Sequence, residues 1–188
     1  MFYFRHFRRG LLLLAGLSAG PLSAAPLITE FLASNAAGLT DEDGALPDWI
    51  ELHNPDATPV DLLGWTLTDD ASRPARWTFP STVIAPGGYL VVFASGKNRA
   101  VSGAPLHTNF SLSAGGEFLA LYPPDNLTPA MAWFPAYPAQ SADVSYGLLG
   151  TTAGGTQAFF PVPTPGSANM PFTAPAEAVG FSLGSRTF

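Results

Sequence analysis

Residues 87–95 read GGYLVVFAS, and this stretch decides the fold class. Its centre, YLVVF, is apolar at every position, which is typical of a strand buried on both faces, so we predict a central strand here. On either side, residues 65–68 and 144–148 alternate apolar with small or polar side chains, the period of a half-buried strand. No stretch after the first 25 residues shows a convincing amphipathic helix, and the pattern indicates an all-β sandwich or barrel.

Further short apolar runs lie between glycines and prolines, of which the chain has 19 each. Such punctuation separates strands joined by turns. Residues 60–69, VDLLGWTLTD, are one such run. The other expected strands are residues 27–33, 48–55, 76–80, 109–113, 117–124, 130–136 and 157–163.

The first 25 residues have the pattern of a signal peptide. Arg5, Arg8 and Arg9 precede the apolar run GLLLLAGLSAG, and small residues follow, with a cleavage site after Ala25 or Ala24. The apolar run is shorter than the roughly 20 residues that span a bilayer. We therefore predict a cleaved leader at residues 1–25, export to the periplasm, cell surface or medium, and no membrane span after cleavage.

Charge and cysteine content exclude several classes of function. The leader takes three of the eight basic residues and none of the fourteen acidic ones, which leaves 5 − 14 = −9 formal charges. Nucleic acids and anionic lipids attract basic surfaces, so neither is an expected partner. The chain has no cysteine, which excludes disulfides, a thiol nucleophile and a thiolate metal site.

The composition changes near residue 170. MPFTAPAEAVG, beginning at Met170, is rich in alanine and proline and is typical of a linker. FSLGSRTF, residues 181–188, has the pattern of a strand that begins without a partner. We interpret residues 170–188 as a linker and the start of a further, missing domain.

Several ordered motifs resemble one known family. They are DWIELHNP, VDLLGWTLTDD, APGGYLVVFASGKN, LHTNFSLSAGGEFLALY and, near the end, PTPGSAN. Together they are similar to the lamin tail domain of exported bacterial proteins, over residues 26–169. The resemblance implies an immunoglobulin-like β-sandwich that serves as a binding module and carries no known catalytic centre.

The resemblance also implies roles for single positions. Trp65 would be a core anchor beneath a turn at Gly64, and Glu51 and Asn54 would lie on the second strand and at its exit. Apolar positions on the expected strands complete the predicted core. The core positions are Trp49, Ile50, Leu52, Trp65, Leu67, Val91, Phe93, Leu119 and Leu121.

The stretch DEDGALPDWIEL, which begins at Asp41, allows two interpretations. Alternating carboxylates beside a glycine resemble part of a calcium loop, with Asp41, Asp43 and Asp48 as candidate ligands. The twelve-residue helix–loop–helix spacing fails, however. The simpler alternative is a turn before a strand, because Asp and Gly are turn formers. The turn is favoured, and calcium is the one cofactor that the sequence suggests.

No catalytic constellation is apparent. His53 and His107, the histidines outside the leader, are expected to be hydrogen-bonded structural residues rather than zinc ligands. Asp69 and Asp70 are expected to be strand neighbours whose side chains point to opposite faces, so they are poorly suited to act as a glycosidase pair unless a bulge intervenes. Trp133 is the candidate for an exposed tryptophan that stacks on carbohydrate.

Two functions remain open for a chain that is not itself an enzyme. The first is a binding module in a cell-surface or secreted assembly, whose partner is an unknown protein or a surface glycan. The alternative is an N-terminal accessory module of a larger exported enzyme, hydrolase or kinase-like, whose catalytic part lies beyond residue 188.

Overall fold

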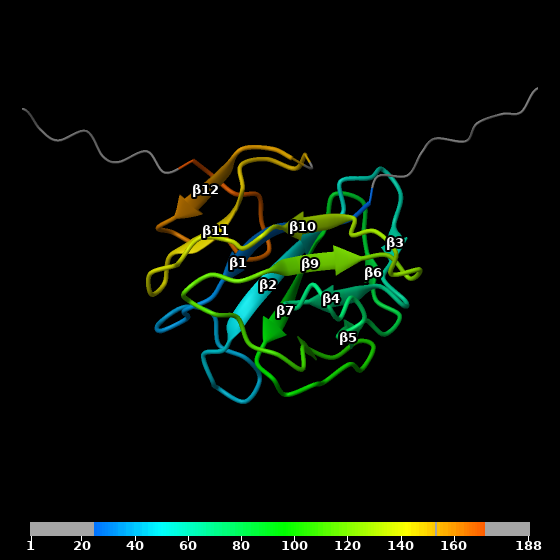
Figure 1. Ribbon diagram of the computed structural model, residues 1–188, viewed down its shortest axis with the longest axis horizontal. Helices are drawn as coiled ribbons and strands as arrows, with labels where there is room; N and C mark the ends of the chain where they lie inside the picture. Colours follow the sequence, from blue (N-terminus) through cyan, green and yellow to red (C-terminus); the bar gives the residue numbers. More distant parts are fainter. Residues whose placement is uncertain (1–24, 153, 172–188) are drawn as a thin grey trace, which may run out of the picture.

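Short strands form the whole regular structure of this protein. The computed structural model describes residues 25–152 and 154–171, and this part of the chain contains twelve strands and no helix (Figure 1). The all-β prediction is therefore confirmed. The strands are β1 (Leu27–Leu32), β2 (Asp48–His53), β3 (Val60–Asp61), β4 (Thr66–Thr68), β5 (Trp77–Thr78), β6 (Val83–Ile84), β7 (Tyr89–Ala94), β8 (Leu106–His107), β9 (Leu119–Tyr122), β10 (Met131–Trp133), β11 (Ser145–Leu148) and β12 (Gln157–Phe160).

The larger sheet has six strands in the order β12-β11-β1-β2-β7-β8. All neighbours are antiparallel except β7 and β8, which are parallel. The two innermost strands are β1 and β2, so the prediction that YLVVF forms the central strand is corrected. β7 lies one place from the edge. Both of its faces carry a hydrophobic cluster, so Val92 and Phe93 are buried while Leu90 and Val91 are half-buried.

The second sheet has four strands in the order β10-β9-β4-β5, and β3 pairs with β6 in a separate two-stranded unit. Figure 1 shows β9 and β10 crossing in front of β1 and β2. Ile28, Phe31 and Val92 from the larger sheet share one core with Leu67 and Leu121 from the smaller sheet. This shared core makes the two sheets a β-sandwich.

Two expected strands differ from the structure. Residues 109–113 form no strand, and their ladder is a single bridge between Ser95 and Ser111. Phe110 and Leu112 are nevertheless buried, which explains the strand-like alternation. Residues 60–69 divide into β3 and β4, because Gly64 has a φ of 79° and the Trp65 N–H donates back to the Leu62 carbonyl, 2.9 Å away.

Five of the nine named core positions lie fully buried in the core between the sheets. They are Ile50, Leu52, Leu67, Leu119 and Leu121. Trp65 packs against this core from a half-buried position. Trp133 is only 3% exposed and so offers no open ring for a sugar.

The remaining positions form a second apolar cluster on the outer face of the larger sheet. Trp49 and Phe93 are buried there with Leu32, and the half-buried Val91 packs against them. Successive residues of a strand point to opposite faces, so Trp49 faces outward where Ile50 faces the core. An outer face that is apolar at this point must be covered by something other than the second sheet.

Several predictions concern residues beyond the described part of the chain. Residues 1–24 of the predicted leader (1–25) and residues 172–188 of the predicted linker and further domain (170–188) lie outside it, so both stay predictions. Among the described residues, no helix has the length and hydropathy needed to cross a membrane.

Candidate binding pocket on the outer face of the larger sheet

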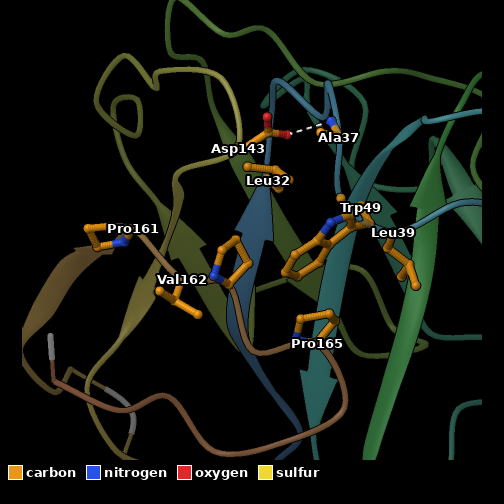
Figure 2. Close-up of a pocket in the computed structure, with 10 residues that line it drawn as sticks. Leu32, Ala37, Leu39, Trp49, Asp143, Pro161, Val162 and Pro165 are labelled. Carbon is orange, nitrogen blue, oxygen red and sulfur yellow. Dashed lines mark hydrogen bonds between the residues drawn. The ribbon is translucent and has the colours of Figure 1, made fainter.

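An apolar pocket of about 340 Å³ opens on the outer face of the larger sheet, over the second cluster. Figure 2 shows Trp49 and Leu32 projecting from β2 and β1 toward two walls of irregular chain. The pocket is lined by Leu32, Ala37, Gly38, Leu39, Trp49, Asp143, Pro161, Val162, Pro163 and Pro165. Trp49 is 1% exposed, so its ring forms part of the base of the pocket rather than an open platform.

The first wall is the loop after β1, residues 36–39, and hydrogen bonds hold it in place. Asp143 Oδ1 accepts from the backbone N–H groups of Ala36 and Ala37 at 2.8 and 2.9 Å. The Asn35 side-chain amide donates to the carbonyls of Leu39 and Pro47 at 2.7 and 2.8 Å. This wall is therefore shaped before any ligand arrives.

The second wall belongs to residues 161–169, PVPTPGSAN, which we call the strap. Prolines at 161, 163 and 165 lack an N–H donor, so the strap cannot continue the ladder of β12. Instead it crosses to β1 and β2, where Thr164 and Gly166 donate to Glu30 and Glu51. Its far end is held by the Asn169 amide, which donates to the carbonyls of Thr29 and Leu148 at 2.9 and 2.8 Å.

Glu30 and Glu51 are two carboxyls with no exposed surface beneath the strap. They are register partners on the antiparallel strands β1 and β2, so their side chains lie side by side on the outer face. Burial, with a smaller contribution from the neighbouring Glu30, raises the pKa of Glu51 to about 7 against the opposing effect of hydrogen bonds from Thr29 and Gly166. Burial likewise raises the pKa of Glu30.

The side of the pocket formed by the strap carries no charge. Residues 144–171, which include β11, β12 and the strap, contain no acidic, basic or histidine residue. Asp143 is the single charged residue among the pocket's lining residues. One side of the pocket is therefore uncharged in an acidic protein, and its exposed side chains include Phe159 and Val162.

The DEDG stretch lies outside this pocket. It forms a turn whose carboxylates pair with the side chains of Lys97 and Arg99. Asp41 Oδ1 accepts from the N–H groups of Asp43 and Ala45, which closes the turn. Lys97 forms ion pairs with Asp41 and, at 2.7 Å, with Asp43. Arg99 bonds Asp43 at 2.7 Å, and its hydrogen bond together with that of Lys97 lowers the Asp43 pKa to about 2.

The three candidate calcium ligands do not form one group. The possible ligand atoms that lie within 4.8 Å of one another belong to Asp41, Glu42 and His107. Asp48 is outside that group, and its carboxylate accepts instead from the Asn35 N–H at 3.4 Å. Calcium binding stays a prediction, and an ion at Asp41 and Asp43 would compete with Lys97 and Arg99.

Both histidines are hydrogen bonded. His53 Nδ1 lies 3.1 Å from the Gly88 carbonyl oxygen, and its ring stacks on Tyr89. His107 Nδ1 lies 2.8 Å from Ser95 Oγ, while its Nε2 is 2.9 Å from Glu42.

Sequence reasoning missed the site beneath the strap. Glu30 lies in the apolar run LITEFLA, where a lone acid signals a buried carboxyl that needs hydrogen-bond donors. PTPGSAN was noted only as the end of the module. Nothing in either motif alone says that the two meet, because more than 130 residues separate Thr164 from Glu30.

The comparisons with known proteins agree with this architecture. The family model described as Lamin Tail Domain matches residues 23–134, more than half of the chain. Neither the curated proteins nor the solved structures gave a match. The structure continues past the matched region, because β11 pairs with β1 and β12 with β11. With a β-sandwich formed by its described residues, the chain belongs to the lamin tail domain family of immunoglobulin-like, non-enzymatic interaction modules.

Proposed function

We propose that this protein is an exported, non-catalytic binding module whose Trp49 pocket receives one large apolar side chain from an uncharged segment of a partner protein. The observation that carries the proposal is a formed apolar pocket in the uncharged region of an acidic protein. Pockets that bind ligands are concave, mostly apolar and largely formed beforehand.

The size and stability of the pocket favour this role. Its volume of about 340 Å³ is at the small end of the range for ligand sites, which suits a single side chain. Both walls are held by hydrogen bonds, through Asp143 on one side and through Glu30 and Glu51 on the other. A formed pocket costs little ordering entropy when it binds.

The chemistry of the lining favours a protein side chain over a sugar. Sugars require several convergent hydrogen-bonding groups, whereas Leu32, Trp49 and Val162 offer none except the indole N–H. Asp143 is the polar side chain of the lining, and its Oδ1 already accepts two backbone hydrogen bonds. With Asp143 as its single charged residue, the lining also limits the repulsion that the acidic remainder would impose on an acidic partner.

Export is the second element of the proposal, and its support is the pattern of the first 25 residues. Three arginines precede an apolar run of signal-peptide length and a small-residue cleavage site. The module would then act in the periplasm, at the cell surface or in the medium.

A nuclear magnetic resonance titration tests the pocket directly. The probes are N-acetyl-leucinamide and N-acetyl-tryptophanamide, with methyl glucoside as the sugar alternative. We expect the apolar probes to shift the amide signals of residues 37–39 and 162–166 with millimolar affinity, which corresponds to about 4 kcal/mol.

Two matched substitutions locate the effect. Val162→Asp places a charge at the rim, and Val101→Asp makes the same change at a site of similar exposure, 63% against 67%, outside the pocket. Binding should be lost in Val162→Asp and retained in Val101→Asp. Shifts produced by methyl glucoside alone, or equal binding by both variants, would contradict the proposal.

A further inference from the structure

Glu30 and Glu51 are buried beneath the strap without a compensating cation. Both have no exposed surface, and among the described residues no Lys, Arg or His lies within ion-pair distance of either carboxyl. Burying two adjacent negative charges without a cation is costly, and such groups keep their protons instead. The geometry around Glu30 gives an independent reason to place a proton there.

That reason is a count of protons at Thr164. Its Oγ1 lies 2.9 Å from Asn169 Oδ1 and 3.0 Å from Glu30 Oε2, yet a hydroxyl has one proton to donate. Asn169 cannot supply a proton to Thr164, because its amide nitrogen already faces the carbonyls of Thr29 and Leu148. Both contacts are satisfied when Thr164 donates to Asn169 and a protonated Glu30 donates to Thr164.

We infer that the strap is a pH-sensitive wall of the Trp49 pocket, closed on the sheet while Glu30 and Glu51 carry protons and released when they ionise. Release would withdraw Val162 and Pro165 from the pocket, so the apolar site exists in mildly acidic solution and is lost in mildly alkaline solution. The effect on binding rests on the function proposed above, whereas the movement of the strap does not.

The two carboxyls and the polar groups that surround them come from four strands and the strap. β1 contributes Glu30, β2 contributes Glu51, and β7 contributes Tyr89, whose pKa is raised by burial and by Glu51. His53, which stacks on Tyr89, has a pKa lowered by burial. β11 contributes the uncharged Ser145, and the strap itself has no titratable side chain. None of these neighbours supplies a positive charge at neutral pH that would hold the carboxylates ionised.

The direction of the pH effect follows from proton binding. The closed state holds a proton on Glu51 up to about pH 7, while a carboxyl in water releases it near its ordinary value of 4.5. Between these values the closed state binds more protons, so closure is complete in acid and weakens as pH rises. If release restores the ordinary pKa, Glu51 alone lowers the closed-to-open ratio about 70-fold between pH 5 and pH 8.

Hydrogen exchange on the full chain, without any ligand, measures this equilibrium. The protection factors of the Thr164 and Gly166 amides are compared between pH 5 and pH 8, with that of Val92 in β7 as the reference for global unfolding. We expect strap protection to fall by tens of fold and to lie below that of Val92 at pH 8. Constant strap protection, or protection equal to that of Val92 throughout, would overturn the inference.

Substitutions assign the effect to the two carboxyls. Glutamine mimics a protonated carboxyl, so Glu51→Gln should remove most of the pH dependence and Glu30→Gln/Glu51→Gln should remove all of it. Asp48→Asn is the matched control, because Asp48 is also on β2, has a pKa raised by burial to about 6, and bonds Asn35 rather than the strap. A double variant as pH-dependent as the wild type would refute the mechanism, and the wild-type profile stands if the variants fail to fold.

The same samples separate this inference from the proposed function. The apolar probes of the titration should bind at pH 5 and lose affinity at pH 8 in the wild type, but not in the double variant. If no probe binds at either pH while strap protection falls as expected, the proposed pocket function fails and the strap mechanism holds. If the probes bind equally at pH 5 and pH 8 and strap protection is constant, the strap mechanism fails and the pocket function holds.

Discussion

Gly147→Ala should destabilise the sandwich severely, for a reason visible only in the structure. Gly147 lies on β11 opposite Glu30, where the register of β1 shifts between Ile28 and Glu30. A Cβ at this position would lie 2.1 Å from the Thr29 carbonyl oxygen and 2.8 Å from the Glu30 Cα. Both obstacles are backbone atoms, so no side-chain rotation relieves the contact.

The magnitude follows from the displacement required. The strands would have to separate by about 1 Å, which combines an overpacking cost of about 1–3 kcal/mol with the loss of one or two ladder hydrogen bonds at about 1 kcal/mol each. Alanine also leaves the unfolded chain less conformational freedom than glycine does, and this stabilises the folded state by about 0.4–1 kcal/mol. We therefore expect a net loss of about 1–4.5 kcal/mol in the free energy of unfolding.

Urea unfolding monitored by tryptophan fluorescence measures this loss, with Gly115→Ala as the matched control. Gly115 also lacks a positive φ, and the nearest atom to an added Cβ is Ser113 Oγ at 3.6 Å. The control should unfold near the wild-type midpoint, and Gly147→Ala far below it with a similar slope. A loss below about 0.5 kcal/mol, or equal losses in both variants, would show that β1 and β11 are not so closely apposed.

Two further predictions concern calcium and export. Thermal melts with calcium and with chelator should superimpose, because Asp41, Glu42 and Asp43 already form ion pairs with Lys97 and Arg99; a rise in midpoint that Asp43→Asn abolishes would establish a calcium loop instead. Intact mass spectrometry of the protein recovered from outside the cytoplasm of its host should give a chain that begins at Ala25 or Pro26, and an uncleaved N-terminus would rule out the predicted leader.

Strand content and apolar periodicity are local properties, and they were predicted well. YLVVF, WTLT and VSYGL correspond to β7, β4 and β11, because alternation or a continuous apolar run reports which faces of a strand are buried. The same signal misassigned residues 109–113, whose Phe110 and Leu112 are buried without a ladder. Burial patterns do not distinguish a strand from an irregular segment that packs on the core.

The candidate calcium ligands show a different limit. Asp41, Asp43 and Asp48 are close in sequence, yet Asp48 begins β2, while Asp41 and Asp43 pair with Lys97 and Arg99 from the segment after β7. Proximity along the chain identified an acidic turn correctly. It could not identify the cations, which come from residues more than 50 positions away.

By itself, the sequence determined the β-sandwich class, its family and its acidic surface, because periodicity, ordered motifs and charge are properties of neighbouring residues. Tertiary structure alone decided that Glu30 and Glu51 lie side by side, that the strap returns to cover them, and that Trp49 is the base of a pocket rather than part of the main core. Those relations depend on strand register and on a crossing of the chain between segments more than 100 residues apart. The pKa of a buried carboxyl rises only when such distant segments come together and exclude water from it. The same contact gives the pocket its second wall.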